Sequence, residues 1–225
     1  MPELQQALLD LFNQECEFDN FIPLNNEAMF ESLRNRINQF THIFGEHNSG
    51  KTHLLKSWVN QANKLSNNAI YLTIDDLKAF SIYDIDLDTY KYIAIDNIDY
   101  ADEETQDSIF KLFNLIKLSN LDNALLTSSK ENLNHTKLRE DLKTRIHSGV
   151  VFHLNNPSDD MLIDAATSYA NKIGLRIDNA ETKYLINHTN RNLGEIISLL
   201  HKISDYSITH KKNLSIPTIK QAINA

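Results

Sequence analysis

The stretch Gly45-Glu46-His47-Asn48-Ser49-Gly50-Lys51-Thr52 decides the fold of this chain, because it fits the pattern G-x-x-x-x-G-K-[ST] in full. In such a loop the glycines let backbone N–H groups turn toward phosphates, the lysine reaches their oxygens, and the hydroxyl ligates Mg²⁺. An apolar run precedes the stretch and a helical pattern follows it, and a helix N-terminus favours anions. Since the chain holds only 5 glycines, chance is a poor explanation, and the stretch predicts a nucleotide-binding P-loop.

Short apolar runs on both sides of the loop have the composition of buried strands. We expect strands at Phe40–Phe44, Ala69–Ile74, Tyr92–Ile95, Ala124–Thr127 and Val150–Leu154. Helical patterns separate most of them, at Lys51–Leu65, Asp102–Leu118 and Thr136–Ile146, and another precedes them at 26–39. We expect a short helix and a loop in the Asp-rich stretch 75–89. Apolar strands that alternate with helices predict an α/β fold, a five-stranded parallel sheet sandwiched by helices.

The character of the sequence changes after Pro157, where no further strand pattern occurs. Ser158, followed by two aspartates, is typical of a helix N-terminus, and Gly174 is typical of a helix end. Helices are expected at 158–174, 179–188, 193–207 and 217–224. We therefore divide the chain into a leader at 1–17, an α/β nucleotide-binding domain at 18–156 and a small C-terminal all-α domain at 157–225.

Composition limits the class of protein. A net charge of −8 and a pI of about 5.5 argue against a grip on duplex phosphate, so we expect no sequence-specific DNA binding. The sequence has no window of the ~18–20 apolar residues that a membrane span needs, and its start lacks the basic segment of a secretory signal. The single cysteine, Cys16, fits a reducing compartment. We expect a cytoplasmic protein without a membrane partner and, since its 9 histidines are scattered, without a structural metal.

The strand expected at 92–95 runs into Asp96, which gives the apolar strand and carboxylate of a Walker B pattern. Asp96 is predicted to hold the Mg²⁺ shell beside the P-loop, together with Thr52. An aspartate that caps a turn at the end of a strand is the simpler alternative. The next residue is Asn97, and an amide cannot act as a general base. We therefore expect weak or no intrinsic ATP hydrolysis.

The order of these segments resembles an AAA+ ATPase domain of the DnaA branch over residues 18–225. Three further segments resemble, in turn, its adenine-wrapping motif, its sensor I and its sensor II helix: Phe18-Asp19-Asn20-Phe21, Leu126-Thr127-Ser128-Ser129 and Asn192-Leu193-Gly194-Glu195-Ile196. The resemblance implies that ADP or ATP, with Mg²⁺, is the ligand and that the C-terminal domain is a lid. The nucleotide-binding residues that we expect beyond the P-loop at 45–52 are Phe18, Phe21, His53, Thr127 and Arg191.

The sensor II segment departs from the pattern of the branch. Gly194 stands where an arginine is expected, and glycine cannot touch a phosphate. Arg191 lies three residues earlier, on roughly the same helical face, and is the candidate to replace that arginine. Together with Asn97, this departure favours a protein that holds a nucleotide, such as ADP, as a conformational latch rather than turning it over.

The leader contains a candidate peptide for protein recognition. Leu8-Leu9-Asp10-Leu11-Phe12 resembles the Q-L-D-L-F peptide that docks on the sliding clamp of the replicative polymerase, with Leu8 in place of the glutamine. The lost hydrogen bond would cost ~0.5–1.5 kcal/mol. The same apolar residues with Leu4 also fit one face of a short helix, and the residues alone leave both interpretations open. The resemblance of the rest of the chain favours clamp binding.

The segment Leu142-Lys143-Thr144-Arg145 resembles the one that carries the arginine finger of the branch. The sequence stops after 214–217 without the helix-turn-helix domain of the initiator, so we expect a regulator rather than an initiator. The resemblance implies that Arg145 enters the ATP site of DnaA in trans. The protein would then stimulate ATP hydrolysis by DnaA while it is bound to the clamp, which prevents premature re-initiation of replication.

Alternatives to this interpretation stay open at the level of the sequence. Arg145 also fits a cation placed near a helix C-terminus. The whole chain also fits a helicase- or transposase-loading ATPase with its own turnover, or a clamp-bound scaffold with a vestigial nucleotide site. Self-association of the chain stays open as well.

Overall fold

The computed structural model describes residues 16–36, 38–66, 68–79, 85–118, 122–189, 191–210 and 214–224. The chain divides into two compact units, Met1–Asn156 and Pro157–Ala225. The predicted clamp-binding peptide at 8–12 and most of the leader lie outside the described residues.

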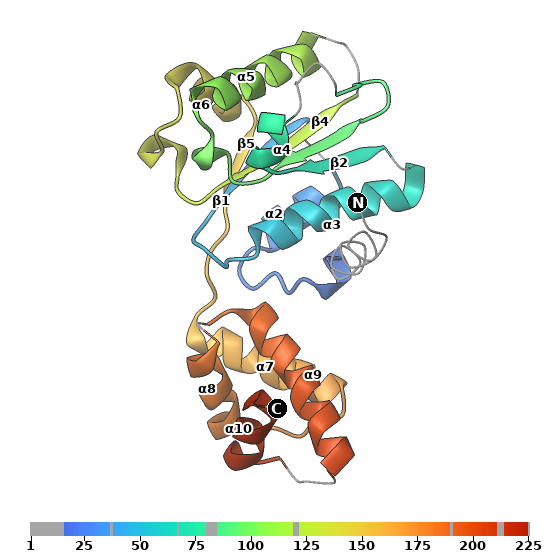
Figure 1. The fold of residues 1–225 in the computed structure, drawn as a ribbon, viewed down its shortest axis with the longest axis vertical. Helices are drawn as coiled ribbons and strands as arrows, with labels where there is room; N and C mark the ends of the chain where they lie inside the picture. Colours follow the sequence, from blue (N-terminus) through green and yellow to red (C-terminus); the bar gives the residue numbers. More distant parts are fainter. Residues whose placement is uncertain are drawn as a thin grey trace. The chain divides into compact units, whose positions relative to one another are not determined.

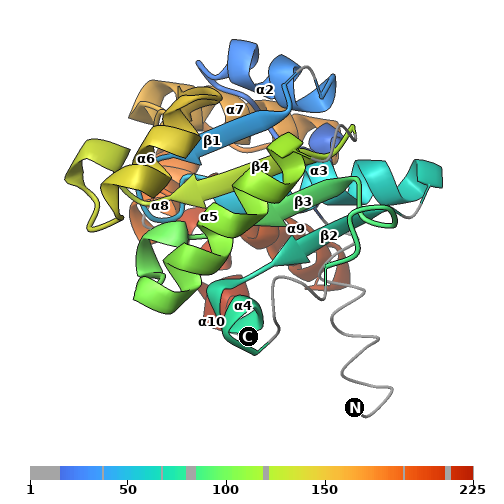
Figure 2. The same ribbon diagram turned by 90° about the horizontal axis from the view of Figure 1, so that it is seen from above.

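The first unit is built on a five-stranded parallel sheet with the strand order β2-β3-β4-β1-β5. Figure 2 shows β2, β3, β4 and β1 side by side in this order. Their bounds are β1 (Phe40–Phe44), β2 (Ala69–Leu72), β3 (Tyr92–Ile95), β4 (Ala124–Ser129) and β5 (Val150–His153). The predicted fold class is confirmed, because near-continuous apolar strands become the buried centre of a doubly covered sheet.

Helices cover both faces of this sheet (Figure 1). One face carries the short helix η1 (Phe18–Asn20), α2 (Glu27–Arg34) and α3 (Lys51–Ser66), whose apolar side chains form one core with the sheet. The other face carries α4 (Ile74–Ala79), α5 (Glu103–Leu118) and α6 (Glu140–His147), with a second core. The short helices η3 (Ile98–Tyr100) and η4 (Leu133–His135) follow β3 and β4. The P-loop lies between β1 and α3, as the sequence predicted.

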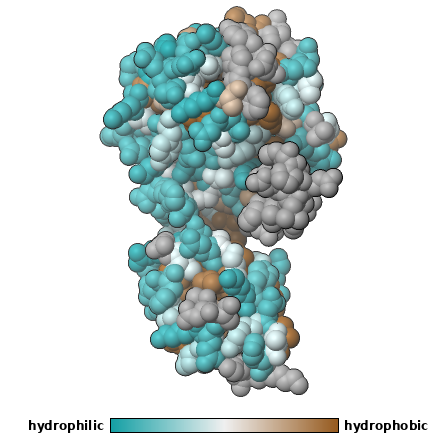
Figure 3. All heavy atoms as spheres, viewed as in Figure 1, coloured by the Kyte–Doolittle hydropathy of each residue, from teal (hydrophilic) through white to brown (hydrophobic). Residues whose placement is uncertain are grey.

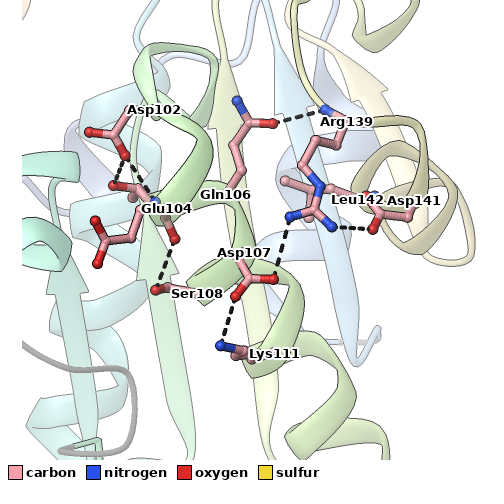
Figure 4. A network of polar contacts seen from close by, with 10 residues as sticks. Asp102, Glu104, Gln106, Asp107, Ser108, Lys111, Arg139, Asp141 and Leu142 are labelled. Atoms are coloured by element: carbon pink, nitrogen blue, oxygen red, sulfur yellow. Dashed lines mark hydrogen bonds and ion pairs between the residues drawn. The ribbon is translucent and has the colours of Figure 1, made fainter.

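Several predicted element bounds are wrong; the helix predicted at 26–39, for example, ends at Arg34. Side-chain hydrogen bonds explain two of the differences. The strand predicted to reach Ile74 ends at Leu72, because Thr73 and Asp76 cap α4. The Thr73 N–H donates to Asp76 Oδ2 at 2.8 Å, and the Asp76 N–H donates to Thr73 Oγ1 at 3.2 Å. The helix predicted from Thr136 begins at Glu140. The reason is that the Arg139 N–H donates to Gln106 Oε1 of α5 at 2.8 Å, which holds the preceding segment extended (Figure 4).

The second unit is all-helical, as predicted. It contains α7 (Asp159–Lys172), α8 (Asn179–His188), α9 (Leu193–His210) and α10 (Ile216–Asn224) around one apolar core. Ser158 Oγ accepts a hydrogen bond from the Met161 N–H, so Ser158 is the N-cap that the sequence indicated. Gly174 has a φ of +78°, a left-handed conformation that suits the end of α7.

The surfaces of the two units are mostly polar. On the face drawn in Figure 3, hydrophilic residues predominate over both units. The large apolar side chains that are exposed among the described residues lie on four elements, two of them on α5: Leu65, Tyr100, Leu115, Leu118 and Ile208. Across the described part of the chain, the helices are too short or too polar to cross a bilayer.

Candidate functional site

The backbone of the P-loop depends on glycine at two positions, Gly45 and Gly50. Gly50 has a φ of +102°, and a Cβ atom there would lie 2.9 Å from the Phe21 ring. A Cβ atom on Gly45 would lie 2.7 Å from the Leu154 carbonyl oxygen. Asn48 also has a left-handed backbone, with a φ of 61°. The loop therefore turns tightly at the carboxyl end of β1, where its N–H groups and the start of α3 favour an anion.

The Lys51 ammonium group lies inside this turn. Its Nζ donates to the Gly45 carbonyl at 2.7 Å and to the Glu46 carbonyl at 2.8 Å, and the residue is only 6% exposed. Burial lowers the pKa of Lys51, and the nearby carboxylate of Asp96 partly counters that effect. A buried ammonium held by neutral carbonyls is a ready partner for a phosphate group.

The Asp96 carboxylate lies next to the P-loop and is almost fully buried. Its Oδ2 accepts hydrogen bonds from Thr52 Oγ1 at 2.6 Å and from the Tyr71 hydroxyl at 2.8 Å, while its Oδ1 accepts one from the Ser128 hydroxyl. Burial raises the pKa of Tyr71, and the Asp96 charge raises it further. A carboxylate and a hydroxyl in contact are hard oxygen ligands, so Thr52 and Asp96 fit a Mg²⁺ ion that keeps several waters.

Asn97 follows the carboxylate in a left-handed conformation, with a φ of 56°. Asparagine tolerates this region better than most residues. Its N–H donates to Ser128 Oγ at 2.8 Å, so Ser128 links the ends of β3 and β4. Asp99, the carboxylate that could replace a missing general base, accepts a hydrogen bond from the Lys130 N–H at 3.2 Å. The residue that directly follows Asp96 therefore has a side-chain amide, which cannot act as a base.

The predicted sensor I residue, Thr127, does not contact this cluster in the structure. Its Oγ1 lies 2.8 Å from His42 Nδ1, and His42 Nε2 lies 3.0 Å from Ser129 Oγ. Thr127 pairs with Ile95, one residue before Asp96, so its neighbour Ser128 projects from the opposite face and reaches the carboxylate. Sequence reasoning missed Ser128 and Tyr71 as site residues, because the register of the strands is what brings them to Asp96.

His42 is fully buried between β1 and β4, and burial lowers its pKa to about 3. The unfolded chain takes up the proton near pH 6.5, whereas the folded chain does not until about pH 3. The stabilisation of the folded chain by neutral, buried His42 is therefore complete above about pH 6.5, and it is lost as the pH falls from there toward pH 3. We expect the free energy of unfolding to drop by about 1.5 kcal/mol between pH 6.5 and pH 5, in urea titrations.

The control for this prediction is His42→Asn, which cannot take up the proton. The variant is expected to be less stable at pH 7 but to lose much less stability between pH 6.5 and pH 5. This range lies above the ordinary pKa values of aspartate and glutamate, so their protonation contributes little. An equal pH dependence in the wild type and the variant would show that His42 is not the responsible group.

An aromatic cluster lies beside the P-loop and brings together three of the predicted nucleotide-binding residues. Phe21 stacks on Phe30 with ring centroids 5.8 Å apart, and its centroid lies 5.6 Å from that of His53. Phe18 packs edge-on against Phe30 at 5.4 Å. The His53 Nε2 lies 3.0 Å from the Glu17 carbonyl, which ties this cluster to the first turn of α3. The cluster offers an aromatic surface next to Gly50.

Arg145 lies in α6, on the face of the sheet opposite α3. Its guanidinium carbon lies 5.6 Å from the centroid of the Phe110 ring, and no described residue forms a salt bridge with it. The nearby Arg139 differs, because it pairs with Asp141 at 2.6 Å and with Asp107 at 3.4 Å, as Figure 4 shows. The contacts of Arg139 join α5 to α6. Among the residues that the structure describes, no carboxylate pairs with Arg145.

Arg191 lies at the start of the segment that leads into α9. Its Nε donates to Asp159 Oδ1 at 2.7 Å and its Nη2 to Asp159 Oδ2 at 3.1 Å, a bidentate pair within the helical unit. Its φ of 58° is left-handed. Gly194 lies in α9, where an added Cβ atom would come within 3.1 Å of Asn192 Oδ1. A role for Arg191 at the nucleotide would require exchange of Asp159 for a phosphate.

The helical unit is similar to a defined sequence family. Residues 159–223 match the sequence model described as "Hda, lid domain". Over 217 residues the chain is 26% identical to an uncharacterized protein of Haemophilus influenzae, which covers 93% of this chain and 94% of that protein.

The fold is similar to that of solved DnaA structures. The AMPPCP-bound DnaA of Aquifex aeolicus has a TM-score of 0.68 and 22% identity, over 84% of this chain and 65% of the DnaA chain. This chain thus spans about two thirds of that protein. Domain III of DnaA from Thermotoga maritima has a TM-score of 0.71 and 19% identity, over 93% of this chain and 96% of the domain. These likenesses show that the chain has the fold of those structures.

Proposed function

We propose that this Hda-like, DnaA-related AAA+ protein stimulates the initiator DnaA to hydrolyse its bound ATP, and that it holds ADP or ATP with Mg²⁺ in its own P-loop. DnaA would be left in its ADP-bound form, and premature re-initiation of replication would be prevented. The lid-family match at 159–223 and the AAA+ core of the DnaA type support this proposal.

The nucleotide would be bound by groups that already converge on one edge of the sheet. The P-loop N–H groups and Lys51 would hold the phosphates, and Thr52 with Asp96 would hold Mg²⁺, which supplies charge neutralisation between the phosphates. Phe21 and His53 would offer an aromatic surface to a base, and Phe18, which is buried, would support that surface through Phe30. The AMPPCP-bound DnaA of similar fold supports this assignment.

Asn97 favours slow hydrolysis of the nucleotide by the protein itself. A side-chain amide cannot accept a proton from water, and its backbone N–H is bound to Ser128. A nucleotide that is bound without rapid hydrolysis would act as a latch that stabilises the first unit. ADP or ATP is therefore proposed as a structural ligand rather than as a substrate with rapid turnover.

The observation that carries the proposed action on DnaA is the charge of Arg145. Arg139 is neutralised by two carboxylates, whereas no described residue pairs with Arg145. A guanidinium that lies over an aromatic ring keeps a fixed direction while its N–H groups stay available. Brought to the γ-phosphate of a neighbouring ATP, it would neutralise the charge that develops during transfer, an effect worth about 10³–10⁵ in rate in other NTPases.

The clamp-binding peptide is a proposal from the sequence. Leu11→Ala with Phe12→Ala is expected to weaken binding to the isolated sliding clamp by about tenfold or more, because each side chain would fill an apolar pocket. Surface plasmon resonance with immobilised clamp measures this. Leu4→Ala is the matched control, since Leu4 belongs to the alternative helical face but not to the peptide. Equal losses for both variants would favour the helix instead.

Steady-state ATP hydrolysis tests the proposed function. DnaA, this chain and their mixture are each assayed with clamp-loaded DNA. We expect little turnover by the chain alone and a rate for the mixture well above the sum of the two. Rapid turnover by the chain alone, stimulated by single-stranded DNA, would favour a loading ATPase and contradict the proposal.

A further inference from the structure

We propose that Tyr71 is a positioning residue that limits how much Mg²⁺ strengthens nucleotide binding by this chain. The inference rests on the proposed nucleotide site. Tyr71 lies in β2, and among the described residues of the site it bonds Asp96, so it acts on that carboxylate rather than on the nucleotide itself.

The sheet register fixes Tyr71 at this place. Tyr71 pairs with Ala94 of β3, and the Asp96 N–H donates to the Leu72 carbonyl at 3.0 Å, which continues the pairing past the end of the strand. Side chains two residues apart project from the same face, so Asp96 lies on the same side of the sheet as Ala94. The Tyr71 hydroxyl thereby reaches Asp96 Oδ2 at 2.8 Å.

The ring of Tyr71 is held from its other side as well. Lys56 of α3 places its Nζ 5.3 Å from the ring centroid, and the residue is half-buried beneath that helix. Rotation of the ring away from Asp96 would require loss of this packing. The hydroxyl is therefore a preorganised donor that is present before a nucleotide binds.

The hydrogen bond from Tyr71 affects Mg²⁺ binding because Asp96 already accepts from several donors. A carboxylate offers about four lone-pair positions, and three of them are filled here by Thr52, Tyr71 and Ser128. Thr52 can continue to donate while its oxygen ligates a metal. Tyr71 and Ser128 instead compete with the waters of a Mg²⁺ ion for the same carboxylate. Because Asn97 follows, the adjacent position adds no second carboxylate to attract the ion.

Removal of the Tyr71 hydroxyl should therefore strengthen the contribution of Mg²⁺. Tyr71→Phe keeps the ring and deletes only the donor. The dissociation constant of ADP is measured for the full chain by isothermal titration calorimetry, once with saturating Mg²⁺ and once with EDTA. The ratio of the EDTA value to the Mg²⁺ value is expected to be about three- to tenfold larger in the variant than in the wild type, as expected for one charge-assisted hydrogen bond.

The matched control is Tyr92→Phe, which removes a hydroxyl from the neighbouring strand, where Tyr92 pairs with Ala69 and not with the residues beside Asp96. It should leave the ratio unchanged. Tyr71→Met repeats the test with a flexible apolar side chain, and thermal unfolding without nucleotide checks that each variant folds. An unchanged or smaller ratio in folded Tyr71→Phe would overturn the role of Tyr71. Absence of ADP binding by the wild type under both conditions would instead overturn the proposed nucleotide site.

Discussion

Arg145→Ala is expected to abolish the stimulation of DnaA ATP hydrolysis and return DnaA to its basal rate. Loss of an arginine finger costs about 10³-fold or more in other NTPases, because the guanidinium acts on charge that appears only in the transition state. The substitution should not unfold α6, since the buried side of that helix is formed by Leu142 and Ile146. The measurement is the rate of phosphate release from DnaA and clamp-loaded DNA with each variant.

Two variants show whether the loss reflects the guanidinium itself. Arg145→Lys keeps the positive charge but loses the planar, multiply donating group, so it should recover only a small part of the stimulation. Arg176→Ala removes one exposed positive charge from the helical unit and should stimulate like the wild type. Full stimulation by Arg145→Ala would rule out the proposed finger.

Lys51→Ala is expected to weaken binding of ADP and ATP by about a hundredfold or more. The ammonium is the positive side chain that the structure places within the P-loop, and a lost charge-assisted contact to two phosphate oxygens amounts to about 3 kcal/mol. Calorimetry or a fluorescent nucleotide analogue measures the affinity. The same variant should lose the rise in unfolding temperature that ADP gives to the wild type.

Lys64→Ala is the matched control for this prediction. Lys64 belongs to the same helix, α3, but its ammonium is exposed and pairs with Glu17 at 2.7 Å. Such surface pairs contribute ~0–1 kcal/mol, so nucleotide affinity and stability should change little. If Lys51→Ala bound ADP as tightly as Lys64→Ala, the scaffold alternative with a vestigial site would be favoured.

The elements with strong local signals could be predicted from the sequence. Phe40–Phe44 and Tyr92–Ile95 are apolar runs bounded by polar residues, and both appear in the structure with the predicted bounds. The end of β2 depends on the local contact between Thr73 and Asp76, whereas the start of α6 depends on a contact that is distant in the sequence. Gln106 sets the start of α6 from α5, 33 residues away from Arg139. Periodicity within a segment contains no information about such a contact.

The same limit applies to the candidate site. Lys51 and Thr52 could be assigned because their motif is contiguous, and the structure places Asp96 against Thr52. Ser128 and Tyr71 reach Asp96 only because of the register between β2, β3 and β4. A shift of one residue would turn their side chains to the other face of the sheet, as the position of Thr127 illustrates. A single sequence predicts the strands but not how they align.

The proposed action on DnaA is tested most directly by the single-turnover rate at which DnaA hydrolyses the ATP that it holds. DnaA is loaded with ATP labelled in the γ-phosphate, freed of excess nucleotide, and mixed with clamp-loaded DNA and increasing amounts of this chain. We expect the release of labelled phosphate to accelerate with added chain until the rate saturates. An unchanged rate of release, from a chain that binds ADP in the same preparation, would contradict the claim that this protein acts on DnaA-bound ATP.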